Sequence, residues 1–379
     1  MRSINWAKVH KRYKEILGKE NYENYANPFA HDLKNNRWII SLSERDTGKT
    51  TNFLIVCLII WWDYGYSTAY VRSDTQQLTY AKLQNLFNIV LDFDYITKIT
   101  DGKYNHIAYD RMTKTWHLCN TEGETIETQD EACFYGLSVH NQEEYKSTLN
   151  LPRTTQLIFD EFINQYTYKD DFVNLCHLCS TIFRHRMTPP PTIILLANTL
   201  TKYHFFFSEL GIQKFIKYIK LDEVQEYITK KGTHISVTLI KSNITKVKKE
   251  VNSLLYGFEN PLLNSITGGE WAIENYPHLT RFLEFETMQK NVFIVQFLEE
   301  YFAADYIIID NKTFLYFHEV NIEKLRDREI YTICDVVHDN EIPIEYILKP
   351  MENCINLKLV YYQNNEIGDL VKNVIDYFK

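Results

Sequence analysis

The sequence predicts an α/β protein with a mostly parallel sheet, because apolar strands and helices alternate along the first 240 residues. Three segments, 37–42 (RWIISL), 155–159 (TQLIF) and 192–197 (TIILLA), are almost continuously apolar, as strands buried on both faces are. A fourth, 53–62 (FLIVCLIIWW), follows a turn and predicts a helix that is apolar on every side and lies inside an α/β layer.

Composition limits the class of protein. The chain has 379 residues, 45% of them apolar and 24% charged, which indicates one large or two ordinary globular domains. The net charge of −8 excludes a surface coated in positive charge but allows a local phosphate-binding patch. Seven scattered cysteines are typical of a reducing compartment, and the ten-residue apolar segment is too short to span a bilayer. We therefore expect a soluble intracellular protein.

Further elements complete the predicted first domain, residues 1–240. Residues 1–30 have helical character, 67–72 (STAYVR) predict a strand, and 78–93 predict a helix with one apolar stripe. Residues 97–150 show no strong pattern. A helix over 171–186 is expected to end before the three prolines at 189–191.

A change of character after residue 240 predicts a domain boundary. Residues 241–249 are basic, and the best turn signals of the chain, Asn260-Pro261 and Gly268-Gly269, follow them. We assign 241–275 to a linker. The remaining residues, 276–379, predict a smaller α+β domain with short strands near 291–298, 306–309 and 313–317 and a last helix over 367–378.

The most specific motif is SERDTGKT, residues 43–50, between a predicted strand and the apolar helix. A phosphate-binding loop, or Walker A motif, needs backbone N–H groups at a helix N-terminus, a lysine for the phosphates and a hydroxyl for Mg²⁺. Lys49 and Thr50 supply the last two, whereas Ser43 stands where the usual pattern has its first glycine. A strand-turn-helix connection that happens to contain GKT is the alternative.

Two acidic residues, Asp160 and Glu161, end the predicted strand over 155–159 and complete a Walker B pattern. A carboxylate there, on a strand next to the loop, can hold Mg²⁺, and its neighbour can polarise a water molecule. Acidic pairs at strand ends are common, so the pattern gains its meaning from the loop upstream. Together the two motifs predict a nucleotide hydrolase.

Three other residue sets have two interpretations each. Arg184 and Arg186 either reach the nucleotide of a neighbouring subunit or cap a helix. Asn198 either contacts the γ-phosphate or ends a strand. Cys176 and Cys179 lie on an amphipathic helix without a second ligand pair, which favours core packing over a metal site.

In this combination the sequence resembles the DNA-packaging ATPases (terminase large subunit equivalents) of small phi29-like podovirus phages. The family pattern G-x-R-G-x-G-K-S corresponds to residues 43–50, with Arg45 kept and Ser43 and Asp46 in place of glycines. FDEF matches 159–162, T-V-F-R-x-R matches 181–186, and L-S-N matches 196–198. Leu137-Ser138-Val139 followed by Lys146-Ser147 also matches. The first 20 or so residues have no counterpart.

The resemblance implies a P-loop ASCE-type ATPase domain, a small linker and an RNase H/nuclease-like C-terminal domain that has lost its catalytic carboxylates. It implies a homopentameric ring on the portal of a procapsid that translocates double-stranded viral DNA with ATP and Mg²⁺. A packaging RNA is a further candidate partner, and no membrane is involved. Such a protein works in the host cytoplasm and transiently on the procapsid. The implied catalytic residues are Glu161, Arg184 as an arginine finger in trans, and Lys146 as a second trans-acting cation. The implied metal ligands are Thr50 and Asp160. The implied nucleotide contacts are made by Ser43, Arg45, Asp46, Thr47, Gly48, Lys49, Thr50 and Asn198.

Cleavage of DNA by the C-terminal domain is not expected. A two-metal nuclease needs several carboxylates that converge at strand ends. The available acids do not stand mid-strand in the usual setting, and Gln296 occupies a position where an acid is expected; the acids are Glu299, Glu300, Asp305, Asp310 and Glu319. Two other functions remain as alternatives, a helicase or repair ATPase and a non-hydrolysing nucleic-acid-binding module.

Overall fold

A computed structural model describes residues 3–43, 47–120, 131–148, 151, 153–163, 168, 170–184, 189–198, 204–220, 222–240, 276–279, 284–297, 300–320, 328–333 and 340–378. These residues form two compact units. The first contains the described residues up to 198 together with 219–240, and the second contains 204–218 together with 276–378. The predicted linker, 241–275, lies outside the described residues. No described helix has the length and apolar character needed to cross a membrane.

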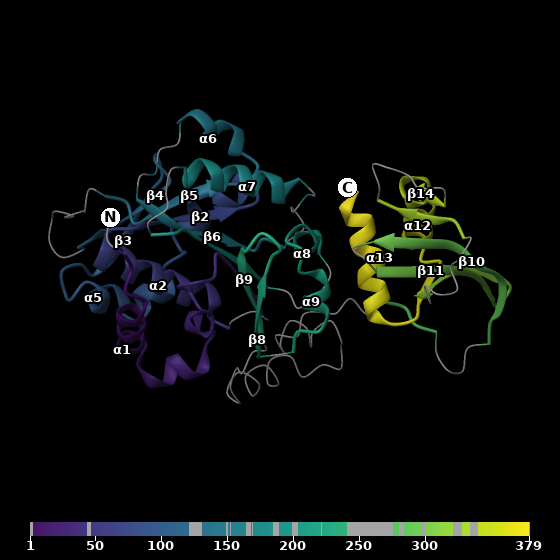
Figure 1. The fold of residues 1–379 in the computed structure, drawn as a ribbon, viewed down its shortest axis with the longest axis horizontal. Coiled ribbons are helices and arrows are strands. Elements are labelled where there is room, and N and C mark those ends of the chain that lie inside the picture. The colour runs from purple at the N-terminus through teal and green to yellow at the C-terminus, as the bar shows by residue number, and fades with distance from the viewer. Residues whose placement is uncertain are drawn as a thin grey trace. The chain divides into compact units, whose positions relative to one another are not determined.

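The first unit is built on a nine-stranded sheet whose centre is parallel, as the sequence predicts (Figure 1). Its order is β3-β4-β5-β2-β6-β7-β1-β9-β8. The parallel strands are β5 (Phe134–Ser138), β2 (Ser67–Arg72), β6 (Thr154–Asp160), β7 (Thr192–Ala197), β1 (Trp38–Ser43) and β9 (His234–Ile240). Antiparallel strands close both edges, β3 (His106–Asp110) with β4 (Thr115–Cys119) on one and β8 (Val224–Ile228) on the other.

Strand β7 lies between β1 and β6, which corrects one detail of the sequence analysis. The strand that ends in Asp160 is not next to the strand that ends in Ser43. Leu196 of β7 pairs with Asp160 on one side and with Ser41 on the other. The nearly uniform apolar strands could not reveal this order, because each of them is buried on both faces and fits any central position.

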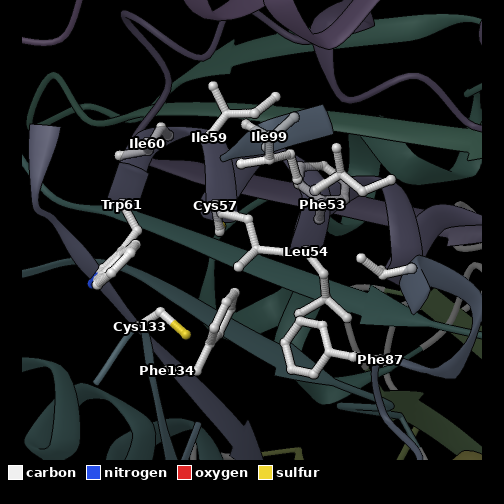
Figure 2. Close-up of a cluster of buried hydrophobic side chains, with 14 of the residues drawn as sticks. Phe53, Leu54, Cys57, Ile59, Ile60, Trp61, Phe87, Ile99, Cys133 and Phe134 are labelled. Carbon is white, nitrogen blue, oxygen red and sulfur yellow. The ribbon is translucent and has the colours of Figure 1, made fainter. Parts of the chain in front are cut away.

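Helix α2 (Lys49–Tyr64) is the apolar helix that the sequence predicts, and it fills one layer of the core. Its side chains from Phe53 to Trp61 are all buried, and they meet Phe87, Ile99 and Phe134 (Figure 2). Helix α1 (Trp6–Asn24), kinked at Gly18, packs against α2. Helix α5 (Tyr95–Ile99) also contacts both helices.

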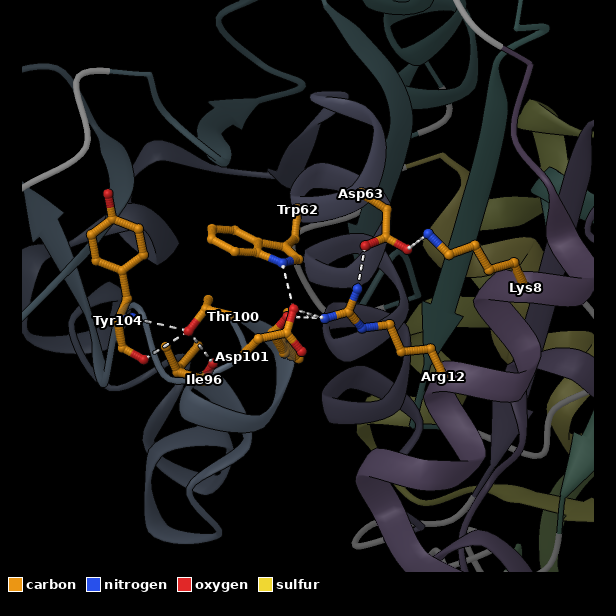
Figure 3. Close-up of polar contacts among 9 residues, drawn as sticks. Lys8, Arg12, Trp62, Asp63, Ile96, Thr100, Asp101 and Tyr104 are labelled. Carbon is orange, nitrogen blue, oxygen red and sulfur yellow. Dashed lines mark hydrogen bonds and ion pairs between the residues drawn. The ribbon is translucent and has the colours of Figure 1, made fainter.

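A network of polar side chains fastens α1 to the end of α2 (Figure 3). Arg12 pairs with Asp63 of α2 and donates to Asp101 Oδ2 at 2.7 Å and to the carbonyl of Ile99 at 2.6 Å. Lys8 Nζ lies 3.2 Å from the other Asp63 oxygen. Because the Asp63 side chain is only 4% exposed, these cations neutralise a nearly buried charge.

The predicted continuous helix over 78–93 is wrong. The segment contains η2 (Thr75–Leu78), α3 (Tyr80–Leu83) and α4 (Asn88–Asp92) instead. Amide groups of Leu86 and Asn88 bond to carbonyls three residues earlier, so tight turns separate the two short helices. The turns leave Phe87 fully buried against Phe134, and the apolar stripe still faces the core.

Helices α6 (Gln142–Thr148) and α7 (Asp171–Ile182) pack together on the side of the sheet away from α1 and α2 (Figure 1). Helix α7 begins where the sequence predicts and ends four residues earlier, and residues 185–188 lie outside the described part of the chain. In the segment without a strong pattern, β3, β4, β5 and α6 occupy most of the described residues.

The second unit has a six-stranded sheet of order β14-β13-β10-β11-β12-β15. A long antiparallel meander, β10 (Glu286–Phe297), β11 (Glu300–Ile309) and β12 (Lys312–Glu319), forms its centre, flanked by β13 (Ile330–Thr332), β14 (Glu341–Pro343) and β15 (Val360–Tyr362). Helices α12 (Glu345–Asn356) and α13 (Asn365–Tyr377) share its core, and α8 (Phe205–Glu209) and α9 (Gln213–Lys217) belong to the same unit. The sequence analysis does not predict α12, which carries Pro350.

Candidate functional site

Polar side chains gather at the carboxyl ends of the central parallel strands of the first unit. Ser43 ends β1, Asn198 follows β7, Asp160 ends β6 and Arg72 ends β2. The carboxyl ends of parallel strands meet at one edge of a sheet, which is where open α/β sheets hold their ligands. Asn198, Asp160 and Arg72 are joined to one cluster by hydrogen bonds and ion pairs, whose other members are Lys49, Thr50 and Glu161.

The predicted phosphate loop is closed by side chains where the usual motif relies on glycine. Ser43 Oγ lies 2.7 Å from Thr47 Oγ1, and both residues are buried. Gly48 then adopts a left-handed conformation (φ 73°) as the N-cap of α2, a role for which glycine has no steric penalty. Glu44, Arg45 and Asp46 lie outside the described residues, so the roles of Arg45 and Asp46 stay predictions.

The N-terminal segment braces this loop. The Ala26 amide donates to the Thr47 carbonyl at 2.8 Å, and the Asn52 side chain donates to the Ala26 carbonyl at 2.7 Å. The Tyr25 ring covers Gly48, and a Cβ built on Gly48 would lie 3.0 Å from Tyr25 Cδ1. The residues that have no counterpart in the phage family pattern therefore lead, through α1, to a contact with the loop itself.

Lys49 and Asn198 face each other across the cluster. The Lys49 ammonium group donates to Asn198 Oδ1, and Asn198 Nδ2 donates to Glu161 Oε1 at 3.3 Å. Lys49 is nearly fully buried, so its charge depends on such polar contacts. The Asn198 side chain therefore lies between Lys49 and Glu161, and its contact with a γ-phosphate stays a prediction.

Thr50 and Asp160 bring two side-chain oxygens together. Thr50 Oγ1, in the first turn of α2, donates to Asp160 Oδ1 at the end of β6 at 3.1 Å, although β7 separates β6 from β1, the strand that leads to α2. Hydroxyl and carboxylate oxygens suit Mg²⁺, which keeps several water ligands and binds few protein groups. Among the described residues no group of three or more His, Cys, Asp and Glu side chains could hold a metal. A cation here would take its other ligands from water and phosphate.

Arg72 is the site residue that the sequence analysis missed. Its guanidinium lies 3.2 Å from Asp160 Oδ2 and also pairs with Glu161 Oε2. Tyr70, two residues earlier, donates to Asp160 Oδ2 at 2.8 Å. Burial disfavours the charge on Arg72, but Tyr70 and the two carboxylates outweigh this effect and raise its pKa. The sequence did offer a signal for Arg72, because it is an arginine at the carboxyl end of a predicted strand, 67–72.

The backbone at Glu161 is strained. Its φ of 54° lies in the left-handed region, which a residue with a side chain adopts at a cost of about 1–2 kcal/mol. The Phe162 amide donates to the Leu196 carbonyl at 3.1 Å and fixes this turn against β7. Strained residues cluster at functional sites, where the surrounding structure imposes the conformation. The Glu161 carboxylate is thereby directed at Arg72 and Asn198.

Comparison with known proteins supports the fold. No protein-family model matches the sequence, and no curated protein matches it. Among solved structures, the Phi-28 gp11 DNA packaging motor aligns with 94% of this chain and 98% of its own, at 16% identity and TM-score 0.53. The bacteriophage Phi-29 viral genome packaging motor assembly aligns with 94% and 100%, at 16% identity and TM-score 0.52.

This chain has the fold of the phage DNA packaging motors. The alignments span both units, so the fold that the resemblance implies is confirmed over nearly the whole length. At 16% identity the likeness establishes the packaging-motor fold and leaves the chemistry to the residues described above.

The two residues expected to act in trans are placed by α6 and α7, whereas the cluster is placed by strand ends and the start of α2. Arg184 is exposed, two residues beyond the end of α7. Lys146 lies in α6, with its side chain outside the description, and Arg186 lies beyond the described residues. Within the packaging-motor fold, both helices stand on the same side of the sheet (Figure 1). Their roles stay predictions.

The second unit of the packaging-motor fold holds two of the acids considered for cleavage in defined contacts. Asp305 accepts from the Asn291 amide at 2.7 Å and lies 3.1 Å from His318 Nε2. Glu319 ends β12 and accepts from the Asn364 side chain at 3.4 Å. Glu299 lies outside the described residues. The expected absence of nuclease activity stays a prediction.

Proposed function

We propose that this protein is an ATP-driven motor that translocates double-stranded viral DNA into a preformed procapsid. The observation that carries the proposal is a closed chain of contacts at the carboxyl edge of the sheet. The chain runs from Lys49 through Asn198, Glu161, Arg72 and Asp160 to Thr50, the neighbour of Lys49 in sequence. It contains every type of group that phosphoryl transfer to water needs.

Each group has a distinct task in this proposal. Lys49 and the first turn of α2 bind the β- and γ-phosphates. Thr50 and Asp160 hold Mg²⁺, which neutralises charge on the phosphates when bound. Glu161 accepts a proton from the attacking water, a role that requires it to leave the Arg72 guanidinium. Asn198, which contacts both Lys49 and Glu161, couples the phosphate group to the base.

The packaging-motor fold and the motifs support a proposal for assembly and partners. We propose a homopentameric ring on the phage portal, with Arg184 as an arginine finger in trans and Lys146 as a second trans-acting cation. The ring works in the host cytoplasm and transiently on the procapsid, and a packaging RNA is a further candidate partner. The second unit contributes no DNA cleavage in this proposal.

ATP hydrolysis by two variants tests the assignment of the site. Lys49→Ala is expected to weaken ATP binding, whereas Glu161→Gln is expected to bind ATP tightly and to fail to activate water. Turnover is measured with and without DNA and empty procapsids, beside a Glu15→Gln control on the exposed face of α1. Normal turnover by Glu161→Gln would refute its role as base. Full activity that needs neither ring nor procapsid would favour the helicase or repair alternative.

DNA binding tests the second part of the proposal. With a net charge of −8, contact with DNA must use local cationic patches, ignore sequence and weaken steeply with salt. The basic residues that follow β9 are the candidates, although they lie outside the described residues; they are Lys241, Lys246, Lys248 and Lys249. If the fourfold neutralised variant keeps its affinity and salt dependence, these residues do not contact DNA.

A further inference from the structure

A histidine–aspartate pair lies where the chain enters α6, which contains Lys146, and α7, which ends two residues before Arg184. His140 Nε2 lies 3.1 Å from Asp171 Oδ1 and 3.3 Å from Oδ2. Asp171 is the first residue of α7, and His140 comes two residues before the start of α6. The contact therefore lies at the start of both helices, and the helices also pack against each other.

The residues just before α6 are hydrogen-bonded to the end of β2, the strand that ends in Arg72. The Val139 amide donates to the Arg72 carbonyl at 2.9 Å, and the His140 amide donates to the Ser73 carbonyl at 3.1 Å. Ser138 Oγ bonds to the Ser73 carbonyl at 2.9 Å as well. His140 is thus held by its backbone to the end of β2, so its side chain offers Asp171 a fixed partner.

Asp171 is a buried carboxylate with a complete set of contacts. It is 1% exposed, and the Tyr168 amide donates to its Oδ2 at 3.0 Å. Burial raises the pKa of Asp171, while the Tyr168 amide and His140 act in the opposite direction and Asp170 adds to the rise. The pair therefore combines a desolvated acceptor with defined donors, an arrangement that fixes geometry.

We propose that His140 and Asp171 are positioning residues that orient α6 and α7 so that Lys146 and Arg184 reach the nucleotide of the neighbouring subunit. This inference rests on the proposed function, because it assumes that these cations act in trans. Neither His140 nor Asp171 belongs to the cluster that surrounds Lys49 and Glu161.

The pair matters because a small change in angle at the start of α7 becomes a larger displacement at its far end. The 12 residues of α7 rise about 18 Å, so a tilt of about 5° at Asp171 moves the far end by roughly 1.5 Å. A displacement of about 1 Å at a charge-stabilising group can cost on the order of a hundredfold in rate. The same tilt leaves Glu161 in place, because Arg72 and Asn198 hold that side chain independently.

Mixed rings on procapsids with DNA test the proposal, because they separate the subunit that donates the arginine from the one that holds the nucleotide. The donor is Lys49→Ala and the acceptor is Arg184→Ala, each inactive alone and active when mixed. Asp171→Ala is then added either to the donor or to the acceptor. We expect rescue to fall at least about tenfold in the donor and less than about twofold in the acceptor.

Conservative variants supply the matched controls. Asp171→Asn keeps an acceptor oxygen and His140→Gln keeps a nitrogen donor, so both are expected to retain rescue when placed in the donor. His140→Ala replaces Asp171→Ala if the latter does not fold, since the His140 side chain is 23% exposed and its loss is better tolerated. Thermal unfolding of each variant shows that the ring is made of folded subunits.

The outcomes distinguish this inference from the proposed function. Loss of rescue confined to the donor supports the positioning role. Equal loss in donor and acceptor, or full rescue with Asp171→Ala in the donor, overturns it and leaves the trans-acting arginine intact. If the parent mixture of Lys49→Ala and Arg184→Ala recovers no activity, the arginine finger itself is wrong and the positioning role is refuted with it.

Discussion

The Arg72 guanidinium pairs with the Glu161 carboxylate while its other nitrogen contacts Asp160. This contact occupies one oxygen of the Glu161 carboxylate. In the proposed function, Glu161 must leave this contact before that oxygen can accept a proton from water. The pair links Glu161 to the end of β2, and β2 is in turn hydrogen-bonded to β5 beside it.

Arg72→Lys tests whether this contact restrains Glu161. A single ammonium group cannot reach both carboxylates in the same way, so we expect it to stay with buried Asp160 and to release Glu161. ATP turnover without DNA is expected to rise severalfold, and stimulation by DNA to fall. Arg153→Lys, in an exposed pair with Glu131, is the control and should change neither rate. Unchanged coupling in Arg72→Lys would exclude a restraining role.

The contact between Ser43 and Thr47 should be measurable in a double-mutant cycle. Ser43→Ala and Thr47→Val each remove the same buried hydrogen bond, which contributes about 1 kcal/mol. Each single variant is expected to weaken ATP binding several-fold, and the double variant to bind no worse than the weaker single one. ATP affinities from calorimetry provide the check. Additive losses would show that the two hydroxyl groups act separately.

The polar network that joins α1 to α2 should contribute more to the free energy of unfolding than an exposed ion pair on α1 does. Arg12→Ala leaves the nearly buried Asp63 with Lys8 alone, and we expect the free energy of unfolding to fall by about 2–3 kcal/mol. Lys11→Ala removes an exposed pair with Glu15 and should cost no more than about 0.5 kcal/mol. Urea unfolding of both variants measures the difference, and equal losses would contradict the proposed role of Arg12.

Buried His31 predicts a loss of stability in acid. Burial lowers its pKa from 6.5 to about 4, and its Nδ1 lies 2.6 Å from Ser236 Oγ. Between these values the unfolded chain binds a proton that the folded protein does not, so the free energy of unfolding falls as pH drops from 6.5 towards 4. By pH 4.5 this loss is roughly 2–3 kcal/mol.

The variant His31→Asn should reduce that pH dependence. Unfolding free energies at pH 7 and pH 4.5 are expected to differ less than in the unchanged protein. Burial lowers the pKa of His204, in the second unit, to about 3. This histidine should therefore preserve part of the pH dependence of stability in the variant. His177→Asn, on the exposed side of α7, is the control. An unaltered pH dependence in His31→Asn would contradict the assignment.

The local pattern of residues was sufficient to predict the strands and the helix that lead into the site. Strands β1, β6 and β7 are continuous apolar segments, and α2 is an apolar helix that starts directly after Gly48. Their polar ends, at Ser43, Asp160 and Asn198, follow from the same segments. The broken helix over 75–92 shows the limit, because its stripe of buried side chains is compatible with one helix or with two short ones joined by tight turns.

By itself, the sequence determined which residues have the chemistry of a phosphate site, because the groups of a strand-loop-helix motif are neighbours along the chain. Only the tertiary structure decided which distant residues complete the site. The order that places β7 between β1 and β6, the contact of Arg72 with Glu161, the cover of Tyr25 over Gly48 and the pair of His140 and Asp171 all join segments far apart in sequence. Strand order and cross-strand contacts depend on how many buried side chains pack together at once. A local pattern of residues does not specify which of the possible strand orders packs best.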